Sequence, residues 1–506
     1  MRRRDALLLL AAAPSLTPRL GFAQGTPVQA APVQPAASPE AMLRLATRLR
    51  ALEGDGLDPR AYDIPSEAVA ASDPATAQPA IFRAAVAATT DLLHGRVRTM
   101  PAGRVDLVRE TNLVSLTPWM QQLATAAEPA EVIERASLAT PGAAPLRAAL
   151  AEARAVVAQG GWAVIPSGVT TIEPGSTDPV RIPALRARLA AEDRELAASR
   201  DEGATYGPNL LAAVRRWQQA VGYEVDGRVG RISQTALNRP ADWRVNQLLA
   251  ALDTRRAAAL PGPERRIEVN IPDFRLQLIE AGHVNLEMGV IVGRPDRATP
   301  MLRVTLTSLQ FNPPWGVPAR NAKEDLLPRL RRDPVAVQGR GYRFYQSIDG
   351  QMVEVDPTTV EWARVNGDRF PYIVRQDAGD TSALGRIKFT MPNRDDIFMH
   401  DTPDRHLFRR PDRAFSSGCI RLERPMDLLA VTLEGTPGWD RDRALRAVES
   451  RVTSSVSVRR TIPVRLFYQT VMVEEGRVRI RPDIYGLDQR YAALLAAPGP
   501  RMAARI

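Results

Sequence analysis

The hydrophobic period of the chain changes just past its middle, and this change constrains the fold more than any other feature. In the first half, apolar residues recur at helical spacing, as in Met42, Leu45 and Leu49. In the second half they alternate, as in Ile267 and Val269. A period near 3.6 residues indicates helices with one buried face, and a period of two indicates strands. The sequence therefore predicts a multidomain α+β protein, helical first and β-rich afterwards.

Breaks in the helical period divide the first half. Residues 24–38 are rich in Ala, Pro and Gln, as is typical of a disordered linker. Residues 39–181 are predicted to form a helical scaffold domain, and their stretch 161–179, rich in Gly and Pro, is interpreted as a connector. Residues 182–240 are predicted to form a small helical unit in which Gly222 ends one helix before another begins.

The β-rich domain is predicted to span residues 264–450. A turn at residues 280–283 separates two alternating stretches, and residues 460–490 are predicted to form a C-terminal hairpin on the same sheet. Between residues 320 and 388 the alternation fades into charged, proline-containing and aromatic stretches. An interruption of roughly 70 residues is longer than ordinary loops, so it predicts a lid or capping insertion, with a decoration lacking that role as the alternative.

The N-terminus has the layout of an export signal. Arg2, Arg3 and Arg4 precede the apolar run 6–13, and small residues end at Ala23. The run is too short for a bilayer, which needs ~20 apolar residues. We predict that residues 1–23 are a signal peptide cleaved after Ala23 and that the chain is periplasmic, with Sec and Tat export both open.

The charge balance argues against nucleic acid as a partner. The chain carries 67 basic and 57 acidic residues, a net charge of +10, but only 5% aromatic residues and no extended basic patch. Stacking on bases and tracking of phosphates need both features. An anionic polymer or envelope surface suits the charge equally well, as does plain compositional bias.

One cysteine occurs in 506 residues, Cys419, within the stretch AFSSGCIRLE. Exported proteins normally carry cysteines in pairs, so a single thiol indicates either a reactive group or a buried residue acting as a small apolar side chain.

Two of the four histidines, His400 and His406, lie shortly before Cys419. Their spacing of six residues, with no Glu-x-x-His or Cys-x-x-Cys motif, argues against a zinc site. The sequence contains no Gly-x-Ser-x-Gly elbow, which argues against a serine hydrolase. A Cys–His pair remains, in which imidazole is the natural base for a thiol.

The residues before the cysteine favour an oxyanion hole. Ser416, Ser417 and Gly418 are predicted to bend the backbone so that amide groups near Cys419 point toward a developing negative charge.

These residues resemble the catalytic motif of the L,D-transpeptidases with a YkuD-type domain, in which a histidine precedes [S/T]-H/S-G-C-[I/V]-R. The pair is 19 residues apart in this chain, as in the larger YcbB-like members. The resemblance extends to VNIPDFRLQLIEAGHVNLEMGVIVGRPDRATP and FNPPWGVPARNAKEDLLPRL, which look like the family's first strands and its N-P-x-W-x-V-P element, and to GLDPRAY and LLHGRV, which look like its helical scaffold.

The small helical unit is similar to the widespread peptidoglycan-binding module, although an ordinary helical hairpin is the alternative. The matching residues are Trp217, Gln218, Gly222, Asp226, Gly227, Gly230, Thr235 and Leu237.

The resemblance implies roles for the motif residues. Cys419 would be the acyl-accepting nucleophile and His400 its general base and proton donor. Gly418 and Cys419 would supply oxyanion amides, while Ser416 and Ser417 would shape the turn and contact substrate.

Three further positions bear on the comparison with the motif. Arg421 would orient a substrate carboxylate or form an ion pair with Glu423, two residues away. The family commonly has histidine where Ser417 stands, and His406 is the replacement candidate, as an outer contact to substrate. Asp401 is a weak third member, because the family's base is usually oriented by a backbone carbonyl.

The implied function is a periplasmic transferase that releases D-Ala from tetrapeptide stems and forms 3→3 crosslinks in peptidoglycan. A carboxypeptidase on the same bond and a non-catalytic wall-binding scaffold are the alternatives. The implied partners are stem peptides and glycan strands, with no transmembrane anchor, no metal and no organic cofactor, and the oligomeric state is left open. A carbapenem is expected to acylate Cys419.

Overall fold

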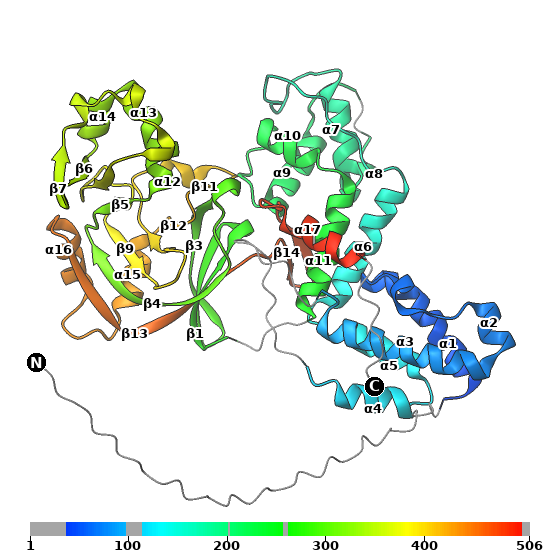
Figure 1. Ribbon diagram of the computed structural model, residues 1–506. Coiled ribbons are helices and arrows are strands. Elements are labelled where there is room, and N and C mark those ends of the chain that lie inside the picture. The colour runs from blue at the N-terminus through cyan, green and yellow to red at the C-terminus, as the bar shows by residue number, and fades with distance from the viewer. Residues whose placement is uncertain (1–36, 98–113, 201–202, 257–261, 498–506) are drawn as a thin grey trace, which may run out of the picture.

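The computed structural model describes residues 37–97, 114–200, 203–256 and 262–497, which form a helical part and a β-rich part side by side (Figure 1). The predicted signal peptide and nearly all of the predicted linker lie outside the described residues; Ser38, at the linker's end, caps the first helix. Within the described ranges, no helix is long and apolar enough to cross a membrane.

The apolar residues at helical spacing near the N-terminus form part of the core of the first helical body. Met42, Leu45 and Leu49 are fully buried in its core. Gly56, in the left-handed conformation, ends the short 3-10 turn that follows the first helix. The helices of this region are α1 (Pro39–Arg50), α2 (Glu67–Ser72), α3 (Pro74–His94), α4 (Thr117–Thr125), α5 (Pro129–Leu138) and α6 (Ala143–Ala158).

The second helical body is larger than predicted at its N-terminal side. Ile165 and Ile172 lie in the stretch interpreted as a connector, yet both are buried in this body's core. Ile172 also forms a β-bridge with Val229. The stretch is therefore part of the body. Its helices are α7 (Arg181–Ala190), α8 (Arg194–Ala198), α9 (Pro208–Val221) and α10 (Arg231–Leu237), and Gly222 ends α9 in the left-handed conformation.

The motif residues of this body hold its own fold. Gln218 is buried, and its amide donates to Asp226 and to the Arg228 carbonyl while its oxygen accepts from the Gly227 N–H. These bonds join the end of α9 to the turn before α10. These shared residues therefore help to hold the fold of the body.

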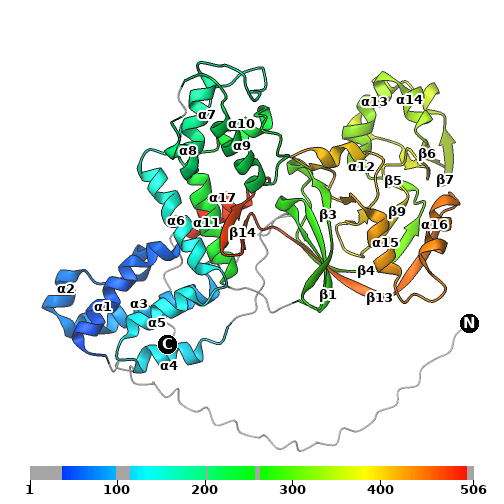
Figure 2. The same ribbon diagram turned by 180° about the vertical axis from the view of Figure 1, so that it is seen from behind.

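The predicted C-terminal hairpin on the main sheet is wrong in its placement. Strand β13 (Ser454–Phe467) lies in the main sheet, but β14 (Val471–Glu474) and β15 (Arg477–Ile480) form a separate two-stranded sheet. This hairpin packs against α6 and α11 (Ala241–Arg255), with Val471 buried among their leucines. The last described helix, α17 (Leu487–Ala496), also packs on α11 and lies among the helices (Figure 2).

Within the described residues, the main sheet has nine strands in the order β11-β3-β12-β10-β9-β4-β13-β1-β2, and it closes on itself because β2 also pairs with β3. The predicted turn at 280–283 joins β2 to β3 through Ala281 and Gly282, both with positive φ. Besides β13, the strands of this sheet are β1 (Arg265–Asn270), β2 (Arg275–Glu280), β3 (His283–Gly293), β4 (Leu302–Phe311), β9 (Ile387–Thr390), β10 (Met399–His400), β11 (Ala414–Ser416) and β12 (Ile420–Leu422). Helices α15 (Pro425–Leu433) and α16 (Arg441–Glu449) connect β12 to β13.

The interruption between β4 and β9 has a sheet and a core of its own. Its four strands run in the order β5-β8-β6-β7, and Phe344 and Trp362 are buried between that sheet and its helices. Lys388, predicted as the last residue of the insertion, instead lies in β9 of the main sheet. The elements are β5 (Trp315–Val317), α12 (Ala319–Asn321), the π-helical turn η5 (Ala322–Leu326), α13 (Leu327–Arg332), α14 (Pro334–Gly339), β6 (Tyr342–Ile348), β7 (Gln351–Val355) and β8 (Ile373–Gln376).

Candidate active site

Two paired strands of the main sheet position the candidate catalytic residues. In β10 and β12, Met399 pairs with Ile420 and His400 with Arg421, in parallel register. Met399 and Ile420 point into the apolar core. Because side chains alternate across a strand, His400 and Arg421 point to the opposite face, and Cys419 directly precedes β12. The local alternation therefore brings the predicted Cys–His pair together at one end of two paired strands.

His400 is held as a neutral base. Its Nδ1 lies 2.5 Å from the backbone oxygen of Asp401, and a carbonyl can only accept, so Nδ1 carries the proton. The lone pair is then on Nε2, and the ring also has a hydrogen-bond contact with the Leu384 backbone. Burial of the ring, and next the positive charge of Arg421, lower the pKa of His400 to about 3. The imidazole is thus uncharged at neutral pH and able to accept a proton.

The backbone carbonyl of Asp401, and not its carboxylate, orients the imidazole. The carboxylate instead accepts from the Arg386 and Thr402 backbone N–H groups and pairs with Arg405. Asp401 therefore fixes the loop after β10, and its side chain does not complete a Cys–His–Asp triad.

Cys419 is half-buried, and its thiol is neutral in the resting protein. Burial raises the pKa of Cys419 to about 11, although the Phe398 backbone N–H and the charge of Lys388 act to lower it. The Sγ atom lies 3.7 Å from the Asp396 carbonyl. A thiol and a neutral imidazole together require that the proton moves as the sulfur attacks.

The turn before Cys419 is closed by Ser416. Its buried hydroxyl donates to the Cys419 carbonyl, at 2.6 Å, and accepts from the Gly418 N–H, at 3.1 Å. Gly418 has φ of +119°, and an added Cβ would lie 3.2 Å from Ile397, so this turn requires glycine. Ser416 therefore shapes the turn. Its contact with the Gly418 N–H must open before that amide can serve an oxyanion.

The Cys419 backbone N–H is the better-placed oxyanion donor. Within the described ranges it donates to no other group, whereas the Ile420 N–H is committed to the Phe398 carbonyl.

Ser417 stands where the resembling family commonly has histidine, and its hydroxyl links the turn to the insertion. It accepts from the guanidinium of Arg297 and from the side-chain amide of Asn321 in α12, both at 2.9 Å. Arg297, whose side chain is only 3% exposed, also pairs with Glu324 and Asp325 in η5. Ser417 is thus held by a buried network and does not point freely at a substrate.

Of the two alternatives for Arg421, the structure does not show the ion pair with Glu423. Arg421 pairs with Asp404, at 3.0 Å, and Glu423 accepts from the Gly289 N–H. Strand β12 ends at Leu422, so Glu423 no longer continues the alternation that would place it beside Arg421. The buried Nε of Arg421 has no hydrogen-bond partner in the described structure. His406 is exposed in the 3-10 turn Arg405–Arg409.

Residues 264–439 match the family model described as YkuD, the L,D-transpeptidase catalytic domain. That segment starts where the β-rich domain starts and includes every residue of the site described above. This segment is an L,D-transpeptidase catalytic domain by its match to the family model. The helical bodies lie outside the match.

A curated relative and two solved structures carry the same family description. A protein of Haemophilus influenzae named "Putative L,D-transpeptidase" is 41% identical over 240 residues, covering 47% of this chain and 48% of that protein. The chain thus spans about half the length of that relative. An L,D-transpeptidase from Xylanimonas cellulosilytica is 15% identical, with 60% of this chain and 100% of that chain covered and a TM-score of 0.18. One from Stackebrandtia nassauensis is 11% identical, with 60% and 97% covered and a TM-score of 0.20. The assignment rests on the family model and the curated relative.

Sequence reasoning missed one charged neighbour of the transpeptidase site, Lys388. It pairs directly with His400 across β9 and β10, so the two side chains share a face of the sheet. Its ammonium lies 4.1 Å from the centre of the Phe398 ring, which in turn lies 5.6 Å from the His400 ring. The chain has only two lysines among 67 basic residues, and this rarity was the available signal.

Proposed function

We propose that this protein is a periplasmic L,D-transpeptidase that forms 3→3 crosslinks in peptidoglycan through an acyl-enzyme on Cys419. One observation carries the proposal. The only cysteine and a buried neutral histidine lie on one face of paired strands in an L,D-transpeptidase domain. A thiol beside a base that can take its proton is the arrangement that acyl transfer requires.

The first step exchanges a peptide bond for a thioester. The Cys419 sulfur attacks the carbonyl carbon of the third residue of a tetrapeptide stem, and the thiol proton passes to Nε2 of His400. The Cys419 N–H faces the oxyanion of the tetrahedral intermediate. The C–N bond then breaks, His400 returns the proton to the leaving amine, and D-Ala departs. Losing one oxyanion donor costs roughly 100- to 1000-fold in other enzymes.

The second step restores the thiol. The side-chain amine of a diamino acid on a neighbouring stem attacks the thioester carbonyl and loses a proton to His400. The C–S bond breaks, and the sulfur takes the proton back from the imidazolium. Water attacking in place of the amine would give a tripeptide, which is the outcome that defines the carboxypeptidase alternative.

The products from disaccharide-tetrapeptides test the proposal, with wild type compared against Cys419→Ala and resolved by mass spectrometry. Crosslinked 3→3 dimers and released D-Ala are expected, together with a thioester of Cys419. Tripeptides alone would replace the transferase by the carboxypeptidase. Unchanged substrate with both proteins would leave a non-catalytic scaffold.

The base assignment has its own test. The His400→Ala variant should remain folded but acylate at least ~100-fold more slowly, the usual scale for a general base. Carbapenem acylation of Cys419, followed by mass, measures this rate without an acceptor. Full activity in His400→Ala would move the base elsewhere, with His406→Ala as the matched control.

The second helical body is proposed to bind the peptidoglycan polymer, and its resemblance to the binding module motivates this. The Cys419→Ala chain should co-sediment with purified sacculi. For export, protein from the periplasm should begin at Gln24, and an intact Met1 there would contradict the proposed cleavage after Ala23.

A further inference from the structure

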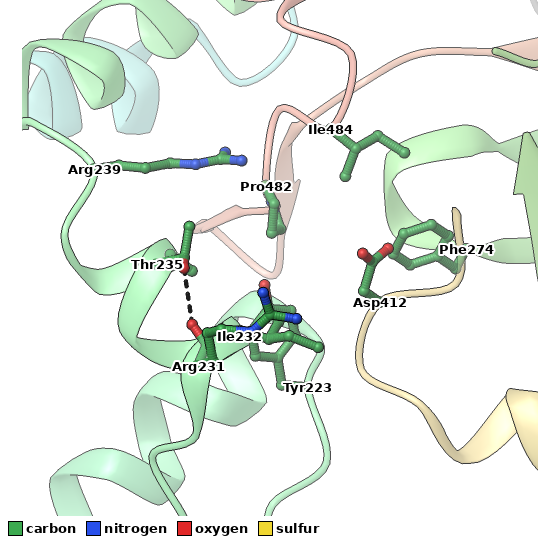
Figure 3. Close-up of a pocket in the computed structure, with 10 residues that line it drawn as sticks. Tyr223, Arg231, Ile232, Thr235, Arg239, Phe274, Asp412, Pro482 and Ile484 are labelled. Carbon is green, nitrogen blue, oxygen red and sulfur yellow. Dashed lines mark hydrogen bonds between the residues drawn. The ribbon is translucent and has the colours of Figure 1, made fainter. Parts of the chain in front are cut away.

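A pocket with charged and apolar walls lies where the second helical body, the transpeptidase domain and the C-terminal segment meet (Figure 3). Its volume is about 200 Å³, and none of the candidate catalytic residues lines it. It is lined by Tyr223, Arg231, Ile232, Thr235, Ala236, Arg239, Phe274, Asp412, Pro482 and Ile484. The site is smaller than the ~300–1,000 Å³ of drug-sized ligand pockets, so it suits the end of a chain or a single residue.

Opposite charges face the pocket from opposite bodies. Arg231 and Arg239 come from the helical body, at the two ends of α10, and Asp412 comes from the transpeptidase domain (Figure 3). In the described structure, neither guanidinium forms an ion pair with a carboxylate. Asp412 uses one oxygen to accept from the Ala414 N–H, at 3.0 Å, and its other oxygen accepts from no group within the described residues. The pocket thus offers two cations to an anion and one carboxylate to a cation.

Uncharged groups complete the lining. Phe274 and Ile484 give an apolar side, and the Tyr223 hydroxyl makes no hydrogen bond within the described residues. Burial raises the pKa of Tyr223 to about 12, so its O–H remains a donor at neutral pH. The Arg239 guanidinium lies 4.9 Å from the Trp243 ring, which limits its motion.

The pocket is preformed because one buried residue joins all three of its walls. Arg481, 5% exposed, donates to the Ala220 carbonyl at the end of α9 and pairs with Asp273 next to β2. Its guanidinium packs on Gly222, where an added Cβ would lie 3.1 Å away. A ligand would therefore meet groups already in place, which lowers the entropy lost on binding.

We infer that this junction pocket binds a zwitterionic amino-acid end of a peptidoglycan stem, with its carboxylate against Arg231 and Arg239 and its ammonium against Asp412. The inference rests on the proposed function for the substrate class. Asp412 lies two residues before β11, which leads into the Cys419 turn. The pocket would thus hold a second part of the polymer beside the transpeptidase domain while another stem reacts.

Binding to the full-length Cys419→Ala chain tests the inference, with a disaccharide-tetrapeptide containing a diamino acid as the probe. Calorimetry should show two sites, of which one is lost when Arg231→Gln and Arg239→Gln are combined. The matched control is Arg215→Gln, an exposed arginine on α9 away from the pocket. An equal loss in Arg215→Gln, or two sites retained in the double variant, would overturn the inference.

A second probe separates the chemistry of the ligand from bulk charge. The same disaccharide-tetrapeptide (a muropeptide), with its carboxylates amidated, should bind to the junction pocket at least 10-fold more weakly. In the active enzyme, the double variant should raise KM for muropeptide several-fold at unchanged kcat. If wild type forms no product yet binds two muropeptides, the proposed function fails and the junction pocket stands. If wild type forms product but binds a single muropeptide, the proposed function stands and the junction pocket fails.

Discussion

At the scale of single residues, the site combines a buried base with a thiol that is protonated at rest. The same burial that makes His400 a neutral acceptor also disfavours the thiolate of Cys419. Lys388 and Arg421 act in one direction on both groups, since a nearby cation lowers both pKa values. Both shifts favour the uncharged forms, a thiol and a neutral imidazole, over a thiolate–imidazolium pair at rest.

The first prediction is the pH dependence of Cys419 alkylation in the resting protein. Because the thiol pKa is raised to about 11, the iodoacetamide rate should be slow at pH 7 and climb steadily above pH 9. Because the His400 pKa is lowered to about 3, no step should appear between pH 5 and 8. Stopped-time mass spectrometry measures the rate. A plateau reached by pH 7 would instead indicate a thiolate–imidazolium pair.

The second prediction concerns Lys388. Replacing it by methionine removes a positive charge that favours the thiolate, so the thiol pKa should rise. Alkylation at pH 8 should slow by about 3- to 10-fold, since the thiolate fraction falls with each rise in pKa. The control is Lys323→Met, the other lysine, which pairs with Asp368 in the insertion. Equal rates in the two variants would remove Lys388 from the electrostatics of the site.

At the scale of elements, the sequence predicted which segments are helices, strands and turns, but not the surfaces against which they pack. The hairpin turn at residues 280–283 follows from local chemistry, as does the end of α9 at Gly222. The separate hairpin β14–β15 does not, because alternation predicts a strand and says nothing of which surface it covers. Ile172 was missed for the same reason. A lone apolar residue in a Gly- and Pro-rich stretch has no period to reveal its burial.

The candidate site was predictable to the same extent. Cys419 and His400 were found from rarity, spacing and resemblance, and the strand register then placed them on one face. The groups that hold them, such as Arg297 and Lys388, come from segments far away in the chain. Only the fold brings those segments together.

The third prediction belongs to the connection between the Cys419 turn and the insertion. Arg297→Met leaves Glu324 and Asp325 without their shared partner and removes a hydrogen bond to Ser417. We expect a loss of about 3 kcal/mol in unfolding free energy, the lower end for breaking a buried pair, because both carboxylates are partly exposed. Urea unfolding measures it. Ser417→Ala, which removes only the hydroxyl, should cost ~1 kcal/mol, and equal costs would contradict this role of Arg297.

At the scale of the whole molecule, buried polar contacts join the helices to one another and hold the C-terminal segment in place. Asp253 of α11 accepts from the Arg96 and Val97 N–H groups and from the Tyr491 hydroxyl of α17. Asp483 accepts from the Tyr468 hydroxyl and from N–H groups at the start of α17. Such contacts depend on geometry more than apolar packing does, so they fix how these segments sit relative to one another.

Arg481 makes the most direct of these connections, and the fourth prediction follows from it. Arg481→Met keeps most of the buried volume but removes the contacts to Asp273 and the Ala220 carbonyl. Asp273 is then left buried without this partner, and the helical body should swing away from the transpeptidase domain. Small-angle scattering should show a larger radius of gyration, while carbapenem acylation of Cys419 should be unchanged because the site's own contacts are intact. The control is Arg479→Met, two residues away, whose half-exposed pair with Glu474 lies within the β14–β15 hairpin. If the two variants scatter alike, the bodies are held by their apolar contacts and Arg481 is only a local ion pair.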